Sequence, residues 1–370
     1  MLSGLLLETR VEALNFLTGK IELGFCATCG FVFNTVFQPE LHNYSSKYAA
    51  TQSYSPTFNK FHRGLAQRLI DRYELNDKDV IEIGCGQGEF LILLCEMGPN
   101  RGVGFDPAYN DYRLESEAKE RIQFVKDFYS EKYTETKGDF LCCKMTLEHI
   151  PDTAVFVNTV RRSIADKLDT TVFFQVPNAA YVLGDIAFWD VYYEHCSYFS
   201  LGSLARLFRQ SNFDVLDLMA EYDDQYIKVE AKPTNAPTEA KLTAEDDIAQ
   251  IKQLVERFEI EAKQSIDNWR SRLDGMQASG KKVVIWGSGS KGVTFLNTLG
   301  ITDEIGYAVD INPHKHGTFM AGTGHEIVGP ELLLSYQPDV VIVMNPIYCP
   351  EIQADLDRLG VKAELLSVEQ

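Results

Sequence analysis

Three glycines at alternate positions separate two apolar segments of this sequence, and no other feature constrains the fold as strongly. Gly84, Gly86 and Gly88 follow the short buried strand expected at 79–83 and precede the apolar stretch 90–95. Glycine permits the tight turn that joins a buried strand to a helix. Further short strands, alternating with helices, are expected at 102–106, 122–125, 140–143 and 172–177. This alternation predicts an α/β fold with a parallel, doubly wound sheet.

A second unit of the same kind begins near residue 281. The strand expected at 282–286 leads into Gly287-x-Gly289-x-x-Gly292, and further strands are expected near 305–310 and 339–344. Before this unit, apolar residues from Ile248 to Leu273 recur at spacings of three and four, which predicts a long amphipathic helix. This helix either joins two domains or forms a dimer, so a monomer and a homodimer both stay open. The expected organisation is an irregular N-terminal segment at 1–55, an α/β domain at 56–235, a linker and long helix at 236–279, and a Rossmann-like α/β domain at 280–370.

The charge and hydropathy of the chain exclude several classes of function. The formal net charge is −18 and no basic stripe is present, so a nucleic-acid partner is not expected. No run of 18 apolar residues occurs and the start lacks a basic leader, so neither a membrane partner nor secretion is expected. The cysteines lie mostly in apolar segments, which is typical of free thiols in a reducing compartment. The sequence therefore predicts a cytoplasmic protein that acts on a small molecule.

The spacing of the first glycine loop distinguishes two cofactors. A dinucleotide places its pyrophosphate at the helix N-terminus and prefers the spacing G-x-G-x-x-G. Here the spacing is G-x-G-x-G, and Glu82 at the strand end would repel an anion. S-adenosylmethionine (SAM) has no phosphate and carries cationic amino and sulfonium groups, so Glu82 favours SAM over NAD. Asp106 ends the next strand, where it can accept hydrogen bonds from both ribose hydroxyls. The alternative is a structural turn without a ligand.

The remaining residues expected at the SAM site follow the next two strands. Asp127 comes after the third strand, where its carboxylate can bond the adenine amino group, and Phe128 can cover the adenine face. Residues after the fourth strand lie at the rim of the same site. The complete set expected to bind SAM is Glu82, Gly84, Cys85, Gly86, Gly88, Asp106, Asp127, Phe128, Lys144, Glu148 and His149.

A polar and aromatic segment at 192–200 follows the fifth strand, on the side where ligands bind in open α/β sheets. His195 can take up a proton near neutral pH, and Glu194 can orient it or act as the base itself. Methyl transfer to a carbon next to a carbonyl needs such a base, and the resulting enolate needs hydrogen-bond donors. Further candidates are Tyr193 and Tyr222 for catalysis, and Tyr48 and Tyr54 for substrate contact. The alternative for His195 is a hydrogen-bonded core histidine before a helix cap.

The cysteine pair Cys26-x-x-Cys29 resembles half of a zinc knuckle. Structural zinc needs four ligands, commonly from two such pairs, and the chain has no second pair. Zinc is therefore in doubt as a cofactor.

The second glycine loop has dinucleotide spacing, with Lys291 at the start of the following helix and Asp310 at the end of the next strand. Three interpretations stay open: an NAD site, a site for the diphosphate of a nucleotide-linked substrate, and a scaffold without a ligand. The substrate-binding candidates in this unit are Gly287, Gly289, Lys291 and Asp310.

Together these residues resemble the three-part sugar C-methyltransferases, which act on nucleotide-linked deoxy-keto sugars. The resemblance rests on Cys26-x-x-Cys29-Gly30, Glu82 to Gly88, Tyr193-Glu194-His195-x-x-Tyr198-Phe199-Ser200, and Gly287 to Gly292 with Asp310-Ile311-Asn312-Pro313. It implies an N-terminal zinc-binding segment, a central class I SAM domain, and a C-terminal Rossmann-like domain that helps to hold the substrate nucleotide. It also implies that Glu194 and His195 lie in the active site, with His195 as the base.

The chain departs from that family at three places. The first cysteine pair of the family is missing, Tyr193 stands where a second histidine is usual, and residues 223–226 replace a glycine-rich stretch that ends in serine and arginine. The last two departures touch the substrate pocket. The expected function is SAM-dependent C-methylation of a nucleotide-linked keto-sugar or related small metabolite. The alternatives are an O- or N-methyltransferase, a protein that binds SAM or a nucleotide without turnover, and an NAD oxidoreductase.

Overall fold

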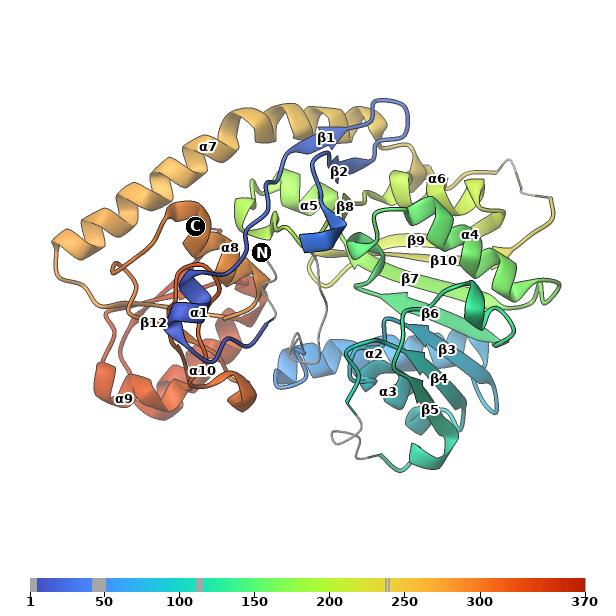
Figure 1. Cartoon of the computed structure of the whole chain (residues 1–370), viewed down its shortest axis with the longest axis horizontal. Helices are drawn as coiled ribbons and strands as arrows, with labels where there is room; N and C mark the ends of the chain where they lie inside the picture. Colours follow the sequence, from blue (N-terminus) through green and yellow to red (C-terminus); the bar gives the residue numbers. More distant parts are fainter. Residues whose placement is uncertain (1–4, 42–50, 111–115, 237, 239, 370) are drawn as a thin grey trace.

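Two sheets, one in the middle of the chain and one near its C-terminus, form the framework of the computed structural model (Figure 1). The structure describes residues 5–41, 51–110, 116–236, 238 and 240–369. The candidate Tyr48 lies outside these described residues.

The central sheet has seven strands in the order β5-β4-β3-β6-β7-β10-β9. Its first five strands run parallel, and the last two form an antiparallel hairpin at one edge. The strands are β3 (Asp79–Ile83), β4 (Arg101–Phe105), β5 (Ile122–Val125), β6 (Phe140–Lys144), β7 (Thr171–Pro177), β9 (Phe213–Glu221) and β10 (Tyr226–Pro233). The central strands β6 and β7 are buried almost throughout, as expected for a parallel sheet that helices cover on both faces. The predicted doubly wound α/β fold is confirmed.

Helices cover both faces of this sheet. α2 (Pro56–Tyr73) and α3 (Glu89–Met97) pack on the face that carries Val80 and Phe140. α4 (Thr153–Ile164) and α6 (Leu201–Gln210) pack on the opposite face, which carries Ile81 and Leu141. Neighbouring residues of one strand join different cores because side chains alternate between the two faces of a sheet.

The N-terminal segment, which the sequence predicts to be irregular, forms short elements that contact the central domain and the C-terminal domain. These elements are α1 (Arg10–Leu14), β1 (Leu23–Phe25) and β2 (Val32–Asn34). β2 pairs with β8 (Ser197–Tyr198), and Leu7 forms an isolated bridge with Phe319 in the C-terminal domain. Because β8 begins two residues after His195, this pairing fixes the backbone beside the expected base.

The C-terminal sheet has five parallel strands in the order β13-β12-β11-β14-β15. The strands are β11 (Val283–Trp286), β12 (Tyr307–Val309), β13 (Ile327–Val328), β14 (Val340–Val343) and β15 (Glu364–Ser367), and the helices are α8 (Ser290–Leu299), α9 (Leu333–Tyr336) and α10 (Cys349–Leu359). The second Rossmann-like fold is confirmed.

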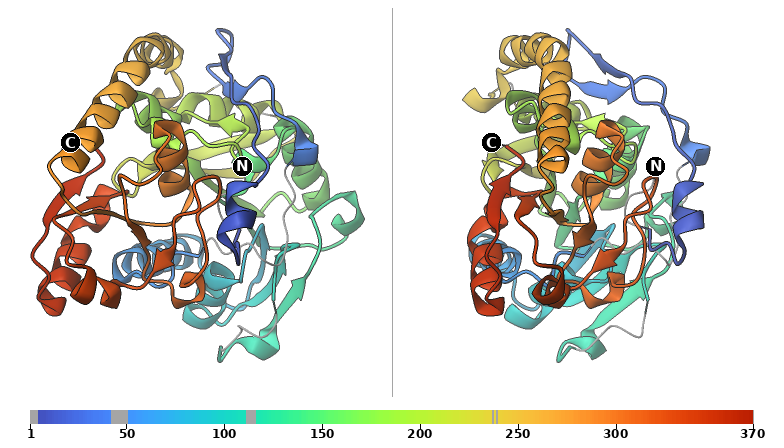
Figure 2. Two further views of the ribbon diagram at one scale, coloured as in Figure 1. Left: turned by 60° about the vertical axis from the view of Figure 1, so that its left-hand side comes forward. Right: turned by 90° about the vertical axis from the view of Figure 1, so that its left-hand side faces the viewer.

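The long helix predicted before the second unit is α7 (Ile248–Ala278), which runs along the outside of the molecule (Figures 1 and 2). Near its start, Ile251 packs in a cluster with Leu183 of α5 (Ala179–Gly184). Near its end, Trp269 and Leu273 pack into the core of the C-terminal domain. The helix therefore connects the two domains through apolar contacts at both of its ends. Among the described helices, none combines the length and the apolar character that crossing a membrane requires.

Candidate active site

One cavity of about 830 Å³ lies between the two glycine-loop units. Its walls include residues at the carboxyl ends of β3, β4, β6 and β7 in the central sheet and of β11, β12 and β14 in the C-terminal sheet. Most residues of the segments 51–55 and 190–195 also line the cavity. Open α/β sheets bind ligands at the carboxyl ends of their strands. The fold therefore brings both glycine loops to one cavity.

The first glycine loop turns with left-handed backbone angles at each of its three glycines. φ is +70° at Gly84, +56° at Gly86 and +82° at Gly88. A β-carbon at Gly84 would lie 2.0 Å from the hydroxyl oxygen of Thr146, so the position also lacks space for a side chain. Gly84 and Gly86 line the cavity, whereas Gly88 caps the start of α3. At Gly84 and Gly86 the loop thus presents its backbone to a ligand.

Asp106, which follows β4, stabilises this loop through hydrogen bonds. Its two carboxylate oxygens accept hydrogen bonds from the backbone N–H groups of Gly86, at 2.9 Å, and Ala108, at 2.7 Å. Burial raises the pKa of Asp106. Each oxygen retains a second lone pair, and Asp106 lines the cavity. A pair of ribose hydroxyls is the kind of ligand that this carboxylate fits.

Glu82 is buried beside the N-terminus of α3. Its carboxylate accepts a hydrogen bond from the N–H of Leu91 at 3.0 Å. Burial raises the pKa of Glu82 to about 8. The carboxyl group of Glu82 thus accepts the hydrogen bond of an N–H in the first turn of the helix, the region where a dinucleotide would place its phosphates. This geometry disfavours a dinucleotide and leaves room for a phosphate-free nucleoside.

Asp127 and Phe128 lie at an open rim of the cavity. Asp127 forms an ion pair with Lys132 at 3.1 Å and accepts a hydrogen bond from the hydroxyl of Tyr133 at 2.7 Å. Phe128 is 61% exposed. Both side chains are therefore accessible to a ligand base at this rim, as the sequence predicts.

Lys144 ends β6 inside the cavity wall. Its ammonium lies 3.0 Å from Nε2 of His62 and 4.7 Å from the ring centre of Phe90. Burial lowers the pKa of Lys144, and it lowers the pKa of His62 to about 2. His62 on α2 also lines the cavity, and it was not among the residues predicted from the sequence. A histidine on the apolar face of a helix is the one sequence feature that points to it.

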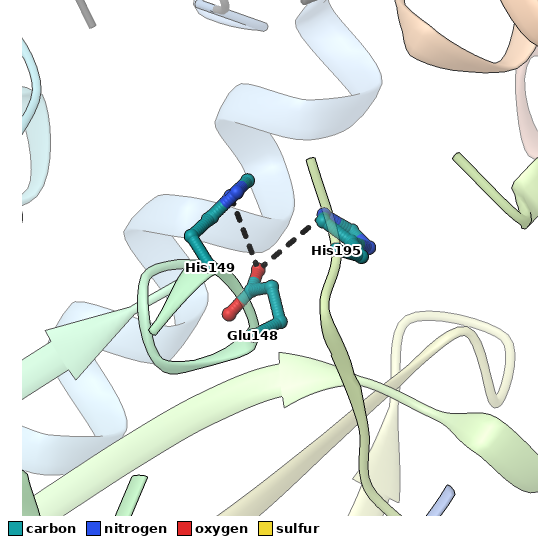
Figure 3. Close-up of side chains that lie close together, drawn as sticks. All are labelled: Glu148, His149 and His195. Carbon is teal, nitrogen blue, oxygen red and sulfur yellow. Dashed lines mark ion pairs between the residues drawn. The ribbon is translucent and has the colours of Figure 1, made fainter. Parts of the chain in front are cut away.

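Glu148, His149 and His195 form a buried cluster on the cavity wall (Figure 3). Oε1 of Glu148 lies 4.0 Å from Nε2 of His149 and 3.9 Å from Nε2 of His195. Burial raises the pKa of Glu148 to about 8 and lowers the pKa of His149 to about 4. The ring of Tyr192 lies against His195, with 4.1 Å between ring centres. The structure thus brings together residues that the sequence assigned to two different roles.

The second glycine loop contacts the central domain directly. Lys291 forms an ion pair with Asp190 at 2.7 Å and donates a hydrogen bond to Gln225 at 3.1 Å. Gln225 also exchanges hydrogen bonds with Asn345, at 3.0 and 2.8 Å. Gln225 belongs to the segment that departs from the resembled family, so this departure contributes to the contact between the domains.

Two family models match the chain in succession. Residues 58–218 match a methyltransferase domain, and residues 225–363 match the C-methyltransferase C-terminal domain. A methyltransferase domain followed by a C-methyltransferase C-terminal domain is the arrangement of a SAM-dependent methyltransferase. The two matched ranges contain the first and the second glycine loop of the enzyme, respectively.

This methyltransferase is 29% identical over 307 residues to the C-methyltransferase NovU of Streptomyces niveus, a match that covers 78% of this chain and 72% of that protein. Among solved structures, magnesium protoporphyrin IX methyltransferase from Synechocystis PCC 6803 with bound SAH is 16% identical, over 48% of this chain and 84% of that chain, with a TM-score of 0.37. An S-adenosylmethionine dependent methyltransferase from Mesorhizobium loti is 14% identical, over 43% of this chain and 92% of that chain, with a TM-score of 0.33.

Most residues that the sequence singles out line this cavity of about 830 Å³. They are Tyr54, Glu82, Gly84, Cys85, Gly86, Asp106, Asp127, Phe128, Lys144, Glu148, His149, Glu194, His195, Gly287, Gly289, Lys291 and Asp310. Their roles toward SAM and substrate stay predictions. Asp310 forms an ion pair with Lys315 at 2.9 Å, a partner that the sequence analysis did not identify.

Two tyrosines predicted to be catalytic do not reach the cavity. The hydroxyl of Tyr193 exchanges hydrogen bonds with the backbone of Gln38, at 2.9 and 3.2 Å, so this side chain points into the N-terminal segment. The hydroxyl of Tyr222 donates to the hydroxyl of Tyr348 at 2.7 Å, at the contact between the domains. The preceding residue Tyr192 lines the cavity instead. The prediction of a direct catalytic contact is therefore wrong for Tyr193 and Tyr222. Tyr193 lies in a turn that the hydrogen bond from the N–H of His195 to the carbonyl of Tyr192 closes, and Tyr222 lies in the turn between β9 and β10.

Cys26 and Cys29 are free cysteines in a tight turn, outside the cavity. The N–H of Gly30 donates to the carbonyl of Cys26 at 2.8 Å, and Arg206 donates to the carbonyl of Cys29 at 2.9 Å. Within the described ranges, the two thiols do not belong to any group of three or more potential metal ligands. A zinc site at this pair stays in doubt.

Proposed function

We propose that this methyltransferase transfers the methyl group of SAM to a carbon atom next to the carbonyl of a nucleotide-linked keto-sugar. The proposal rests on one observation: a single cavity is lined by the first glycine loop, by the Glu194–His195 pair and by the second glycine loop. It is supported by the match of residues 225–363 to the C-methyltransferase C-terminal domain and by the relation to NovU.

The first loop and its neighbours hold the cofactor in this proposal. Backbone groups of Gly84 and Gly86 line the methionine end, and Asp106 accepts hydrogen bonds from the ribose hydroxyls. Asp127 and Phe128 contact the adenine at the rim. SAM supplies an electrophilic methyl group on a sulfonium. The protein supplies position, because reacting atoms that are held in line react far faster than atoms that must meet in solution.

The Glu194–His195 pair accepts the proton that leaves the acceptor carbon. Both residues are buried on the cavity wall, and Glu194 lies with its backbone carbonyl 3.0 Å from Nδ1 of His149. A base in a pocket with little water removes a proton next to a carbonyl more readily, because neighbouring dipoles replace the solvent. Tyr192 lies beside His195 and takes the place that the sequence analysis gave to Tyr193.

The second glycine loop holds the nucleotide part of the substrate. Its backbone at Gly287 and Gly289 lines the cavity at the start of α8. Helix N-termini bind phosphate through their N–H groups and their dipole. Lys291 then exchanges its ion pair with Asp190 for one with the diphosphate.

The test is the change His195→Ala, measured by formation of S-adenosylhomocysteine with a nucleotide-linked keto-sugar. We expect activity to fall at least about 100-fold, which is the usual contribution of a general acid–base group. Tyr193→Phe is the matched control, because this side chain is adjacent in sequence but outside the cavity. Full activity of His195→Ala would contradict carbon methylation and favour methylation of an acidic hydroxyl group.

A further inference from the structure

Three potential metal ligands, one carboxylate and two imidazoles, lie close together on the cavity wall. Glu148 and His149 belong to a 3-10 helix, Leu147–His149, that follows β6, and His195 comes from the segment before β8. The possible ligand atoms of these three residues all lie within 4.8 Å of one another, and Figure 3 shows both imidazole rings beside one carboxylate oxygen. The sequence assigned these residues separately to cofactor binding and to catalysis.

The protonation of His149 follows from its other ring nitrogen. Nδ1 lies 3.0 Å from the backbone carbonyl of Glu194, which can only accept a hydrogen bond. Nδ1 must therefore carry the proton, and Nε2 presents a lone pair toward Glu148. A histidine that is oriented in this way by a backbone carbonyl is the usual arrangement of a metal ligand.

Glu148 needs a partner that the described part of the chain does not supply. Its side chain is 1% exposed, and neither carboxylate oxygen has a hydrogen-bond partner among the described residues. The two imidazole nitrogens, at 3.9 and 4.0 Å, are beyond hydrogen-bonding distance. A buried carboxylate without a partner is costly, and such a group commonly marks an ion or a water.

We infer that Glu148, His149 and His195 bind one divalent first-row transition-metal ion of the Zn²⁺ type. Two imidazoles and one carboxylate form a donor set that these ions prefer, and three protein ligands leave a position open to a substrate or water. An ion about 2.1 Å from each atom in a tetrahedral site requires ligand atoms about 3.4 Å apart. The two separations from Glu148 Oε1, 4.0 Å to His149 and 3.9 Å to His195, exceed that value by roughly half an ångström.

This site deepens the proposed function and rests on it for its role. The open position faces the cavity, so the ion lies where it can bind the carbonyl oxygen of the acceptor. Its charge weakens the adjacent C–H bond. The proton of that bond passes to the carboxylate of Glu194, and its electron pair becomes the carbon–carbon double bond of an enolate, whose oxygen carries the negative charge. His195 then acts as a metal ligand, and Glu194 is the member of the pair that accepts the proton.

The test is a titration of full-length, chelator-treated protein with Co²⁺, followed by calorimetry and by visible absorption. The double change Cys26→Ser and Cys29→Ser removes the second candidate metal-binding site, the cysteine pair. We expect this double variant to bind one Co²⁺ with ligand-field bands and without a thiolate charge-transfer band. Glu148→Gln and His195→Asn should each weaken binding by at least about 10-fold. Glu89→Gln is the matched control, because Glu89 is another carboxylate on the cavity wall and should leave Co²⁺ affinity unchanged.

Far-ultraviolet circular dichroism and thermal unfolding report whether each variant is folded, and a folded Glu148→Gln or His195→Asn protein suffices for the test. The inference is overturned if Co²⁺ binding is absent, if it is lost in the cysteine double variant, or if it is unaffected by either triad change. Co²⁺ binding is measured without an acceptor, so its result is independent of the proposed substrate. Intact Co²⁺ binding without carbon methylation would contradict the proposed function and leave the metal site standing.

Discussion

Replacing Asp106 with asparagine keeps the shape of the side chain and removes its charge, at the position expected to hold the cofactor ribose. In the structure both carboxylate oxygens already accept a backbone N–H, from Gly86 and from Ala108. Asparagine retains one oxygen and replaces the other by an NH₂ group, which would face a backbone donor. The change therefore disturbs the loop and removes an acceptor from the ligand.

The magnitude follows from the number of hydrogen bonds. Two ribose hydroxyls donating to a carboxylate contribute about 1.5–3 kcal/mol each, whereas a neutral amide oxygen returns only about 0.5–1.5 kcal/mol for one of them. Allowing for partial compensation by water, the loss of SAM binding free energy is about 2–4 kcal/mol. This corresponds to a dissociation constant for SAM that is roughly 30- to 700-fold higher.

Isothermal titration of SAM into the wild type and into Asp106→Asn measures this loss directly. Glu351→Gln is the matched control, because Glu351 is a carboxylate on the C-terminal wall of the same cavity that accepts hydrogen bonds from Ser55 and Thr57. Its effect on SAM binding should be below about 1 kcal/mol. An affinity of Asp106→Asn within about threefold of the wild type, or a larger effect of the control, would refute the assignment of the ribose to Asp106.

Three further changes test the fold around the site. Gly88→Ala places a β-carbon 2.4 Å from the ring of Phe124 at a backbone angle φ of +82°, so the free energy of unfolding in urea should fall by about 2–4 kcal/mol; an unchanged value would contradict the packing. Lys228→Met leaves the fully buried carboxylate of Glu230 without its lysine, which should cost about 3 kcal/mol in the same assay, whereas no loss would show that Arg68 and Arg72, which also pair with Glu230, neutralise it alone. Partial burial favours a higher pKa for Asp217, but its hydrogen bond from Lys228 contributes to a net lowering of the pKa to about 2. The ionised Asp217 therefore stabilises the folded protein fully above about pH 4, and this contribution is lost as the pH falls toward 2. After solvent screening it amounts to about 1 kcal/mol of unfolding free energy. When the unfolding free energy is measured against pH, Asp217→Asn should lack this part of the decrease at acid pH.

The sequence predicts the central framework well because the framework depends on local patterns. The run before Gly84 is apolar and buried on both faces, and the turn after it needs glycine for steric reasons that are independent of the rest of the fold. The same holds for the second loop and for α7, whose apolar spacing reflects two contact regions, one around Ile251 and one around Trp269. Periodicity and glycine spacing are local signals, so they survive without knowledge of tertiary contacts.

The site was less predictable wherever the decisive contact is distant in sequence. Tyr192 and Tyr193 have similar chemistry, but in the folded chain Tyr192 lines the cavity, whereas the hydroxyl of Tyr193 bonds to the backbone of Gln38. The sequence favours Lys291 as a phosphate ligand, but it does not indicate the ion pair with Asp190, which lies in the other domain. The convergence of Glu148 with His195 likewise joins segments 47 residues apart. Such contacts follow from packing and not from any local pattern.

The most direct test of the central claim follows a ¹³C-labelled methyl group from SAM into a nucleotide-linked keto-sugar by NMR. The account predicts transfer, with the labelled methyl carbon bonded to a ring carbon next to the carbonyl and with one S-adenosylhomocysteine formed for each methyl transferred. A label on oxygen or nitrogen would contradict carbon methylation. A protein that binds NADH in this cavity and leaves the label on SAM would contradict the assignment as a whole.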